Sequence, residues 1–166
     1  MKTIFITGAN GLAGAAACQY FLDKGYHVVA LVRDINYKSQ MHVLNRCSVV
    51  KGDILDKELM RAILSKYEAD FILHLASQPF VRICHNDPYT GYMTNFVGVL
   101  NILEAVRTLK KRPEKTIIMT SDKQYAEAPV PYTEETLPQV GDSYATSKTC
   151  QDMISLSYAR TYDLPI

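Results

Sequence analysis

The chain has 166 residues, of which 48% are hydrophobic and 21% charged, as expected for one globular domain with a sizeable core. Its 18 Lys and Arg nearly balance its 17 Asp and Glu, so no basic field favours nucleic acid or anionic lipid. The four cysteines form no CxxC pair, the histidines have no metal-ligand spacing, and no apolar run has the length of a membrane span. We therefore expect a cytoplasmic protein with reduced thiols and without a metal site.

Short apolar stretches rich in β-branched residues alternate with stretches of helical periodicity. The predicted strands are Thr3–Thr7, His27–Val32, Ser48–Val50, Asp70–Leu75 and Thr116–Thr120, with the start of another at Asp163–Ile166. The predicted helices are Leu12–Lys24, Asp56–Lys66, a long one from Pro88 to about Leu109, and one from Asp142 or Ser143 to about Tyr162, preceded by a loop over Ala126–Val140. This alternation predicts an α/β fold, a doubly wound parallel sheet of the Rossmann type in three α/β/α layers.

Three glycines at a spacing of three follow the first predicted strand. Gly8 suits a tight turn, Gly11 would let the backbone approach a pyrophosphate, and Gly14 would let the next helix pack closely. The free N–H groups at the start of that helix attract phosphate. Because the turn lies inside a predicted βαβ unit, we interpret it as a dinucleotide site that includes Asn10 and Leu12. The alternative is a tight turn without a ligand.

The end of the second predicted strand bears on the choice of dinucleotide. An acidic residue there would bind both ribose hydroxyls of NAD, but position 32 is valine. Arg33 follows, and its guanidinium can pair with the 2′-phosphate of NADP, unless it simply points into solvent. Asp34 keeps NAD open. We therefore expect NADP, with NAD as the alternative.

Tyr144 and Lys148 are four residues apart on the last predicted helix, so they share a face. A free phenol loses its proton only at about pH 10, and a nearby lysine ammonium favours the phenolate. The phenolate can then accept the proton of a sugar hydroxyl as hydride leaves the adjoining carbon. We predict that both residues are catalytic and contact the cofactor; the alternative is an unrelated surface pair.

Taken in this order, the motifs resemble those of the extended branch of the short-chain dehydrogenase/reductase family. The glycines are spaced GxxGxxG after Thr7, Gly52-Asp53-Ile54 follows the third predicted strand, and His74-Leu75-Ala76-Ser77 follows the fourth. The resemblance implies that Asp53 and Ile54 hold the adenine. It also implies that the cofactor is lined by Leu75, Ala76 and Ser77.

Within that family, Ser121-Asp122-Lys123 after the fifth predicted strand looks most like CDP-glucose 4,6-dehydratase, and the stretch from Lys24 to Arg33 looks like the NADP-dependent GDP-mannose 4,6-dehydratases. The resemblance implies Ser121 as the hydroxyl partner beside the catalytic tyrosine. It implies Asp122 as an acid and Lys123 as a base or electrostatic stabiliser. The alternative is the polar start of a loop.

Three further residues belong to the predicted site. Gln78 and Arg82, in a segment similar to the same dehydratases, are expected to contact the substrate, although Arg82 can equally lie in a loop. Asn95 lies among apolar residues of the long helix, where an asparagine must find hydrogen-bond partners. The resemblance implies that it braces the helix of Tyr144, and we include it among the cofactor-site residues.

The resemblance implies a nucleotide-sugar 4,6-dehydratase, which oxidises C4 of a nucleoside-diphosphate hexose, eliminates water across C5 and C6 and returns hydride to C6. The alternatives are an epimerase or reductase of the same family, or a non-catalytic NAD(P)-binding fragment. We expect residues 1–166 to form the NAD(P)-binding domain without the family's C-terminal strands and substrate lobe, which leaves open whether this chain acts alone. Family resemblance also suggests a homodimer through helices near 88–110 and 143–162.

Overall fold

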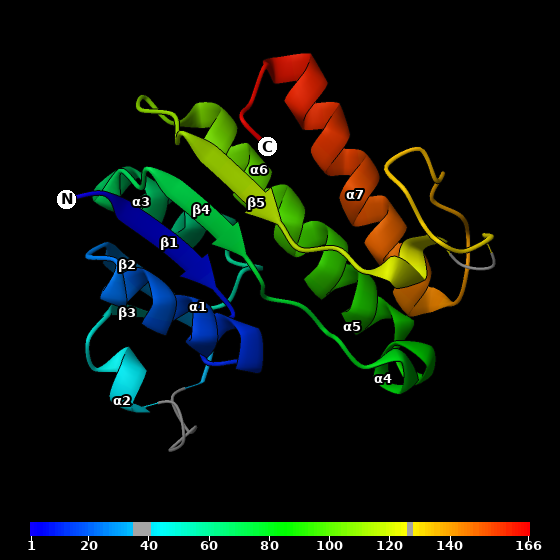
Figure 1. Cartoon of the computed structure of the whole chain (residues 1–166), viewed down its shortest axis with the longest axis horizontal. Helices are drawn as coiled ribbons and strands as arrows, with labels where there is room; N and C mark the ends of the chain where they lie inside the picture. The colour runs from blue at the N-terminus through cyan, green and yellow to red at the C-terminus, as the bar shows by residue number, and fades with distance from the viewer. Residues whose placement is uncertain (35–40, 126–127) are drawn as a thin grey trace.

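The computed structural model describes residues 1–34, 41–125 and 128–166. Five parallel strands form one sheet in the order β3-β2-β1-β4-β5 (Figure 1). The strands are β1 (Thr3–Thr7), β2 (His27–Val32), β3 (Ser48–Lys51), β4 (Phe71–His74) and β5 (Lys115–Ile118). Five of the predicted strands and the Rossmann-type sheet are confirmed, with strand ends that differ from the prediction by at most two residues.

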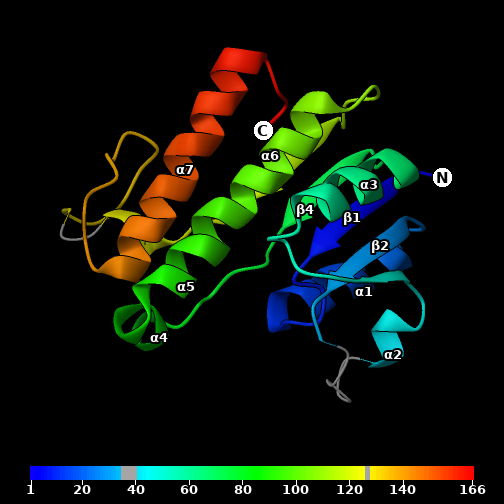
Figure 2. The same ribbon diagram turned by 180° about the vertical axis from the view of Figure 1, so that it is seen from behind.

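Helices cover both faces of this sheet. In chain order they are α1 (Leu12–Asp23), α2 (Met41–Leu44), α3 (Lys57–Tyr67), α4 (Val81–Asn86), α5 (Pro88–Tyr92), the π-helix η2 (Met93–Val97), α6 (Gly98–Thr108), the 3-10 helix η3 (Asp122–Tyr125) and α7 (Ser143–Tyr162). Helix α1 lies on one face, whereas α3 and α6 lie on the other, with α7 beside α6 (Figures 1 and 2). The predicted three layers are therefore present.

Aspartates fix where three of the helices begin. Asp56, Asp87 and Asp142 each accept a hydrogen bond from the backbone N–H three residues ahead, at 2.9, 3.1 and 2.9 Å. These caps satisfy amides that have no partner inside the helix. Pro88 stands directly after the second cap, where its missing N–H costs nothing.

The structure differs from the helix predictions in two details. The helix expected from Pro88 to about Leu109 is present from Pro88 to Thr108, but η2 divides it, because five residues there follow i to i+5 hydrogen bonding. Helix α4 was not predicted at all, since its six residues follow Pro79 and are too few to show a helical period. Arg82 therefore lies in a helix and not in a loop.

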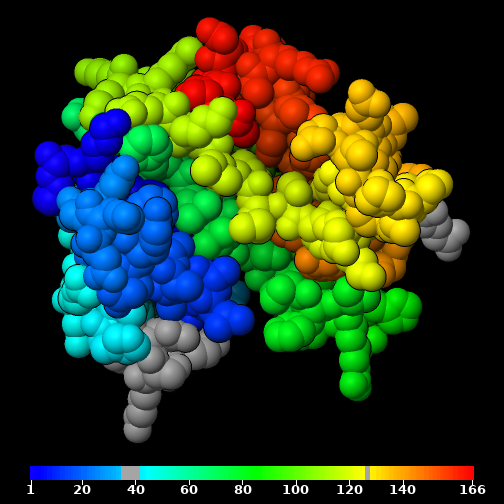
Figure 3. Space-filling model, viewed as in Figure 1, coloured from blue at the N-terminus to red at the C-terminus, as the bar shows by residue number. Residues whose placement is uncertain are grey.

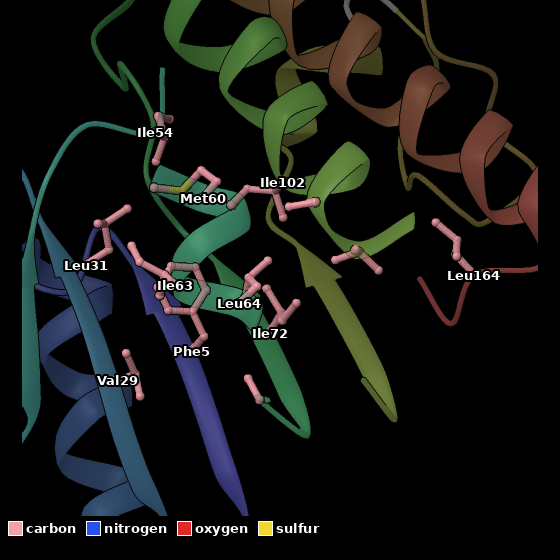
Figure 4. Close-up of a cluster of buried hydrophobic side chains, with 13 residues drawn as sticks. Phe5, Val29, Leu31, Ile54, Met60, Ile63, Leu64, Ile72, Ile102 and Leu164 are labelled. Atoms are coloured by element: carbon pink, nitrogen blue, oxygen red, sulfur yellow. The ribbon is translucent and has the colours of Figure 1, made fainter. Parts of the chain in front are cut away.

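The two sides of the sheet have separate cores. On the α1 side, Ile4, Ile6 and Val28 pack with Cys18 of the helix. On the α3 and α6 side, a larger cluster joins Phe5 and Ile72 of the sheet to Met60, Leu64 and Ile102 of the helices (Figure 4). Strands β1 and β2 are buried on both faces, which explains why their sequences are almost continuously apolar.

The last residues turn back onto the edge of the sheet beside β5. Leu164 is buried in the larger core, and the carbonyl of Pro165 accepts a hydrogen bond from the N–H of Thr116 at 2.7 Å. The strand predicted at Asp163–Ile166 is not formed, since this segment makes only that contact with the β5 backbone among its backbone hydrogen bonds. Residues 128–140 contain neither helix nor strand, as predicted, whereas residues 126–127 of the expected loop lie outside the described residues.

Candidate active site

The glycine turn joins β1 to α1 with very little space around it. Gly8 has a φ of +67°, and a Cβ atom there would lie 2.8 Å from the backbone nitrogen of Ala76. A Cβ atom on Gly14 would overlap the carbonyl oxygen of Gly8. Only glycine fits both positions. Residues 8 and 14 thus let α1 begin close against the end of β1, as the sequence predicted.

A cavity of about 390 Å³ opens beside this turn, at the carboxyl ends of β1, β2 and β4. The space-filling view shows a hollow between the blue N-terminal region and the green segment after β4 (Figure 3). The predicted cofactor residues that line the cavity are Gly8, Asn10, Gly11, Leu12, Gly14, Arg33, Asp53, Ile54, Leu75, Ala76 and Ser77. The cavity lies where β1 and β4 are neighbours in the sheet. From this point the chain adds β2 and β3 on one side and β5 on the other, so the strand order reverses here. Sheets of this kind bind ligands at such switch points.

Several lining residues are not among the predicted cofactor contacts, although Asp34 is the acidic residue that keeps NAD open. Asp34 accepts a hydrogen bond through its carbonyl from Asn10 Nδ2 at 2.8 Å, and its carboxylate contacts Arg33 Nε at 3.3 Å. The other additions are Ala13, Leu31, Gly52, Pro79 and Thr94. Pro79 lies in the segment whose ends, Gln78 and Arg82, are expected to contact the substrate, whereas Thr94 belongs to no motif and only the folded chain brings it beside the glycine turn.

A buried threonine and histidine hold the strand ends under this cavity. Thr7 Oγ1 accepts hydrogen bonds from the N–H groups of Leu75 and Ala76, both at 3.1 Å. Its own hydrogen therefore points to His74 Nδ1, 2.8 Å away, which leaves the ring proton on Nε2. Burial, together with the charge of Lys148, lowers the pKa of His74 to about 3. The imidazole is thus neutral and acts as a hydrogen-bond acceptor.

Asn95 connects the end of β4 to α7. Its Oδ1 accepts from the N–H of Gln78 at 2.8 Å and from Ser77 Oγ at 3.1 Å. Its Nδ2 donates to Ser147 Oγ at 2.9 Å and to the carbonyl of Gln78 at 3.2 Å. These bonds are the ones that a bracing residue would make, and the role itself stays a prediction. Asn95 does not line the cavity, because these partners occupy its amide completely.

Tyr144 and Lys148 lie one turn apart on α7, and both are buried. Lys148 Nζ is 6.0 Å from the centre of the Tyr144 ring, so the structure brings the predicted pair together. Burial lowers the pKa of Lys148 to about 8, because a charged ammonium loses hydration there. Neither residue lines the cavity at the glycine turn, and their contact with a cofactor stays a prediction.

Ser121, Asp122 and Lys123 form a bonded group at the start of η3. Ser121 Oγ donates to Asp122 Oδ1 and accepts from the N–H of Lys123, both at 3.2 Å. Ser121 and Asp122 line a second cavity, of about 490 Å³, whereas Lys123 does not. The other residues around it include Tyr125, Tyr132 and Glu134, none of them predicted as site residues.

The two predicted substrate residues, Gln78 and Arg82, differ in how exposed they are. Gln78 is half-buried, and its Oε1 accepts from the N–H of Phe80 at 3.3 Å. Arg82 is exposed on α4. Neither residue lines either of these two cavities, so their contact with a substrate stays a prediction.

The turn fits a phosphate group. Gly11 caps α1 without a side-chain hydrogen bond, and no acidic residue occupies the first turn of the helix. The N–H groups there are thus available to an anion, and the helix dipole favours it. In the described ranges, no cluster of three or more His, Cys, Asp or Glu could hold a metal ion. No helix of the described chain has the length and apolar character needed to cross a bilayer.

A doubly wound sheet with a glycine turn at its switch point and a buried Tyr–Lys pair defines a Rossmann-type domain of the epimerase and dehydratase class. Residues 5–166 match the family described as GDP-mannose 4,6 dehydratase. The chain belongs to this family.

The chain is similar in sequence to several proteins named as 4,6-dehydratases. The chain is 35% identical to the GDP-mannose 4,6-dehydratase sdnI of Sordaria araneosa, over 97% of this chain and 30% of that protein. It is 26% identical to the CDP-glucose 4,6-dehydratase of Salmonella typhimurium, over 99% of this chain and 47% of that protein. The chain thus spans less than half of these two relatives.

Solved structures agree with the fold. The UDP-glucose 4-epimerase of Thermotoga maritima, solved with UDP-glucose, matches with a TM-score of 0.88 at 26% identity, covering 98% of this chain and 52% of that one. The UDP-glucose 4-epimerase of Thermus thermophilus, solved with NAD, matches with a TM-score of 0.87 at 25% identity and the same coverage. NAD is therefore a ligand of proteins that share this fold.

Proposed function

We propose that this chain forms the dinucleotide-binding and acid–base part of a nucleotide-sugar 4,6-dehydratase. The observation that carries the proposal is the cavity walled by Gly8, Gly11 and Gly14 at the start of α1. Asn95 supports it, because this residue joins the cavity-lining Ser77 to the helix of the Tyr–Lys pair.

In this proposal the dinucleotide diphosphate rests on the first N–H groups of α1, with the adenine near Asp53 and Ile54. Arg33, exposed at the rim of the cavity, pairs with a 2′-phosphate, so the preferred dinucleotide is NADP. NAD remains the alternative, and it is the one found in the Thermus thermophilus structure. A bound nicotinamide supplies a hydride acceptor, which no side chain offers.

The side chains supply the proton transfers. Tyr144, as a phenolate favoured by the Lys148 ammonium, takes the proton of the sugar C4 hydroxyl. Ser121 donates a hydrogen bond to the same hydroxyl, and Asp122 protonates the leaving C6 hydroxyl. Lys123 serves as the base at C5 or stabilises the negative charge that develops there.

The test has two parts. The chain is titrated with NADPH and NADH while the fluorescence of the reduced nicotinamide is followed. If the chain binds neither nucleotide, the proposal is refuted. The full protein encoded by the gene is then incubated with GDP-mannose, CDP-glucose and dTDP-glucose. A product lighter by one water supports the dehydratase, whereas an isomer of unchanged mass indicates the epimerase alternative.

We also propose that the protein is a homodimer. Met153 and Leu156, three residues apart on α7, are 62% and 47% exposed, and Tyr89 on α5 is 74% exposed. An apolar helix face of this kind suits a bundle with the same helices of a second copy. Sedimentation of the wild type and of Met153→Lys tests this, with a monomeric variant as the expected result.

A further inference from the structure

A glutamine not singled out by any motif lies beside the Tyr–Lys pair. Gln151 follows Lys148 by three residues on α7 and is only 1% exposed. Its Oε1 accepts a hydrogen bond from Lys148 Nζ at 2.9 Å, and its Nε2 donates to the carbonyl of Met119 at 2.9 Å. Since Met119 directly follows β5, Gln151 connects the lysine to the end of that strand.

The orientation of this amide is fixed by its two partners. Met119 offers a carbonyl oxygen, which only accepts, and Lys148 offers an ammonium, which only donates. A flipped amide would place two donors face to face and two acceptors face to face. The oxygen of Gln151 therefore faces the lysine.

Lys148 depends on few polar partners. It is 2% exposed, and the ion pairs found among the described residues do not include it. Beyond Gln151, its Nζ reaches the Met119 carbonyl at a longer 3.4 Å. A buried cation is costly unless it is hydrogen-bonded, so the Gln151 oxygen is its main local support.

The titratable groups around this ammonium come from three elements. His74 lies on β4, Cys84 on α4 and Tyr144 on α7 itself. His74 is neutral, and burial raises the pKa of the Cys84 thiol, which keeps it protonated. Neither His74 nor Cys84 supplies a neutralising charge to the lysine, so the Gln151 oxygen at 2.9 Å is the nearest of the acceptors found for Nζ, ahead of the Met119 carbonyl at 3.4 Å.

We infer that Gln151 is a positioning residue, which holds the Lys148 ammonium near Tyr144 and ties their helix to the strand end that leads to Ser121. The inference rests on the proposed function, because that function gives Lys148 its role. Gln151 acts only through the lysine, and its side chain lines neither cavity.

The test measures the pKa of Lys148 by NMR in the chain labelled with ¹³C-lysine, without any nucleotide. The Lys148→Arg variant identifies the resonance, which in the wild type should titrate at about 8. Gln151→Met keeps the length of the side chain but removes the acceptor, so the pKa should fall by about one unit. Gln151→Glu places a carboxylate there, so the pKa should rise by at least about one unit.

The direction of the shifts separates positioning from simple packing. A loosened core would admit water and raise the pKa in both variants, toward the ordinary 10.5 of lysine. A fall in Gln151→Met together with a rise in Gln151→Glu supports the inference. An unchanged or raised pKa in Gln151→Met would overturn it.

Gln139→Met, at an exposed glutamine before the same helix, is the control and should leave the pKa unchanged. If Gln151→Met does not fold, an unchanged pKa in Gln151→Glu would by itself refute the inference. Because no nucleotide is present, a failure of dinucleotide binding is observed separately and refutes only the proposed function.

Discussion

Asn95 Nδ2 and Ser147 Oγ lie 2.9 Å apart although 52 residues separate them in the chain. Ser147 in turn donates to the carbonyl of Tyr144 at 2.7 Å, within the first turns of α7. The bond therefore joins the π-helical turn of η2 to the helix that carries the Tyr–Lys pair. Single π turns often mark functional sites, and here the turn holds the asparagine whose amide reaches both the segment after β4 and helix α7.

Replacement of this asparagine should destabilise the protein. Asn95→Leu removes the partners of Ser147 and of the Gln78 backbone at a position only 1% exposed. Buried polar groups without partners are costly, so we expect a loss of about 2–4 kcal/mol in the free energy of unfolding. Urea denaturation measures it. Asn86→Ala, at an exposed asparagine of α4, is the control, and an equal effect in both variants would contradict the bracing role.

Much of the sheet and of the cavity could be predicted because local chemistry determines them. The run from Thr3 to Thr7 is rich in β-branched residues, as strands are, and the glycines after it allow a turn that other residues could not form. The partners of Asn95 could not be predicted, since Ser147 becomes its neighbour only through folding. Nothing in the composition of Met93–Val97 distinguishes a π turn from an α turn.

Gln151 was missed for a different physical reason. Hydrophobic periodicity finds the buried face of a helix when that face is apolar. Helix α7 buries a largely polar face, which includes Ser147, Lys148, Thr149, Gln151 and Ser155. Its sequence therefore shows the Tyr–Lys spacing but not which other polar residues point inward.

The third glycine can be tested by adding one methyl group. Gly14→Ala places a Cβ against the Gly8 carbonyl and the Cα atom of Ala9, which are both backbone and cannot turn aside. We expect a destabilisation of about 1–3 kcal/mol and a loss of dinucleotide affinity of at least about tenfold. Thermal unfolding and NADPH fluorescence measure the two effects. Ala16→Ser, at an exposed position of α1, should change neither, and a Gly14→Ala protein that binds normally would disprove the close approach.

Arg33 should decide the choice between the two dinucleotides. Its side chain is 70% exposed and pairs with Asp34 at 3.3 Å, and exposed pairs of this kind are weak enough to exchange for a phosphate. Arg33→Ala should weaken NADPH binding by about ten- to hundredfold and leave NADH binding unchanged. Calorimetric titration with both nucleotides measures this. Arg46→Ala, another exposed arginine paired with an aspartate, is the control. Equal affinities for NADPH and NADH, unchanged in Arg33→Ala, would favour the NAD alternative.

His74 should make the stability of the fold depend on pH in the acidic range. Its pKa is about 3 in the folded chain against 6.5 when unperturbed, because burial penalises the charged ring. Between these values the unfolded state binds one proton more than the folded state. The free energy of unfolding should therefore decrease as the pH falls from 6.5, by up to about 1.4 kcal/mol per pH unit from this group.

The variant that isolates this contribution is His74→Asn, whose Oδ1 can still accept the hydrogen bond from Thr7 Oγ1. Protonation of carboxylates whose pKa values are lowered, such as Asp70 and Glu104, also reduces the stability of the folded chain in acid. These carboxylates are present in both the wild type and the variant, so they do not affect the comparison. Urea denaturation between pH 4 and 7 gives the free energy of unfolding at each pH, which should change less steeply with pH in the variant than in the wild type. The difference in slope corresponds to about one bound proton at most. His85→Asn, which removes an exposed ring on α4, should keep the wild-type slope. Parallel slopes for His74→Asn and the wild type would mean that the histidine binds its proton equally well in the folded and the unfolded chain, and would refute the burial of a neutral ring beneath the cavity.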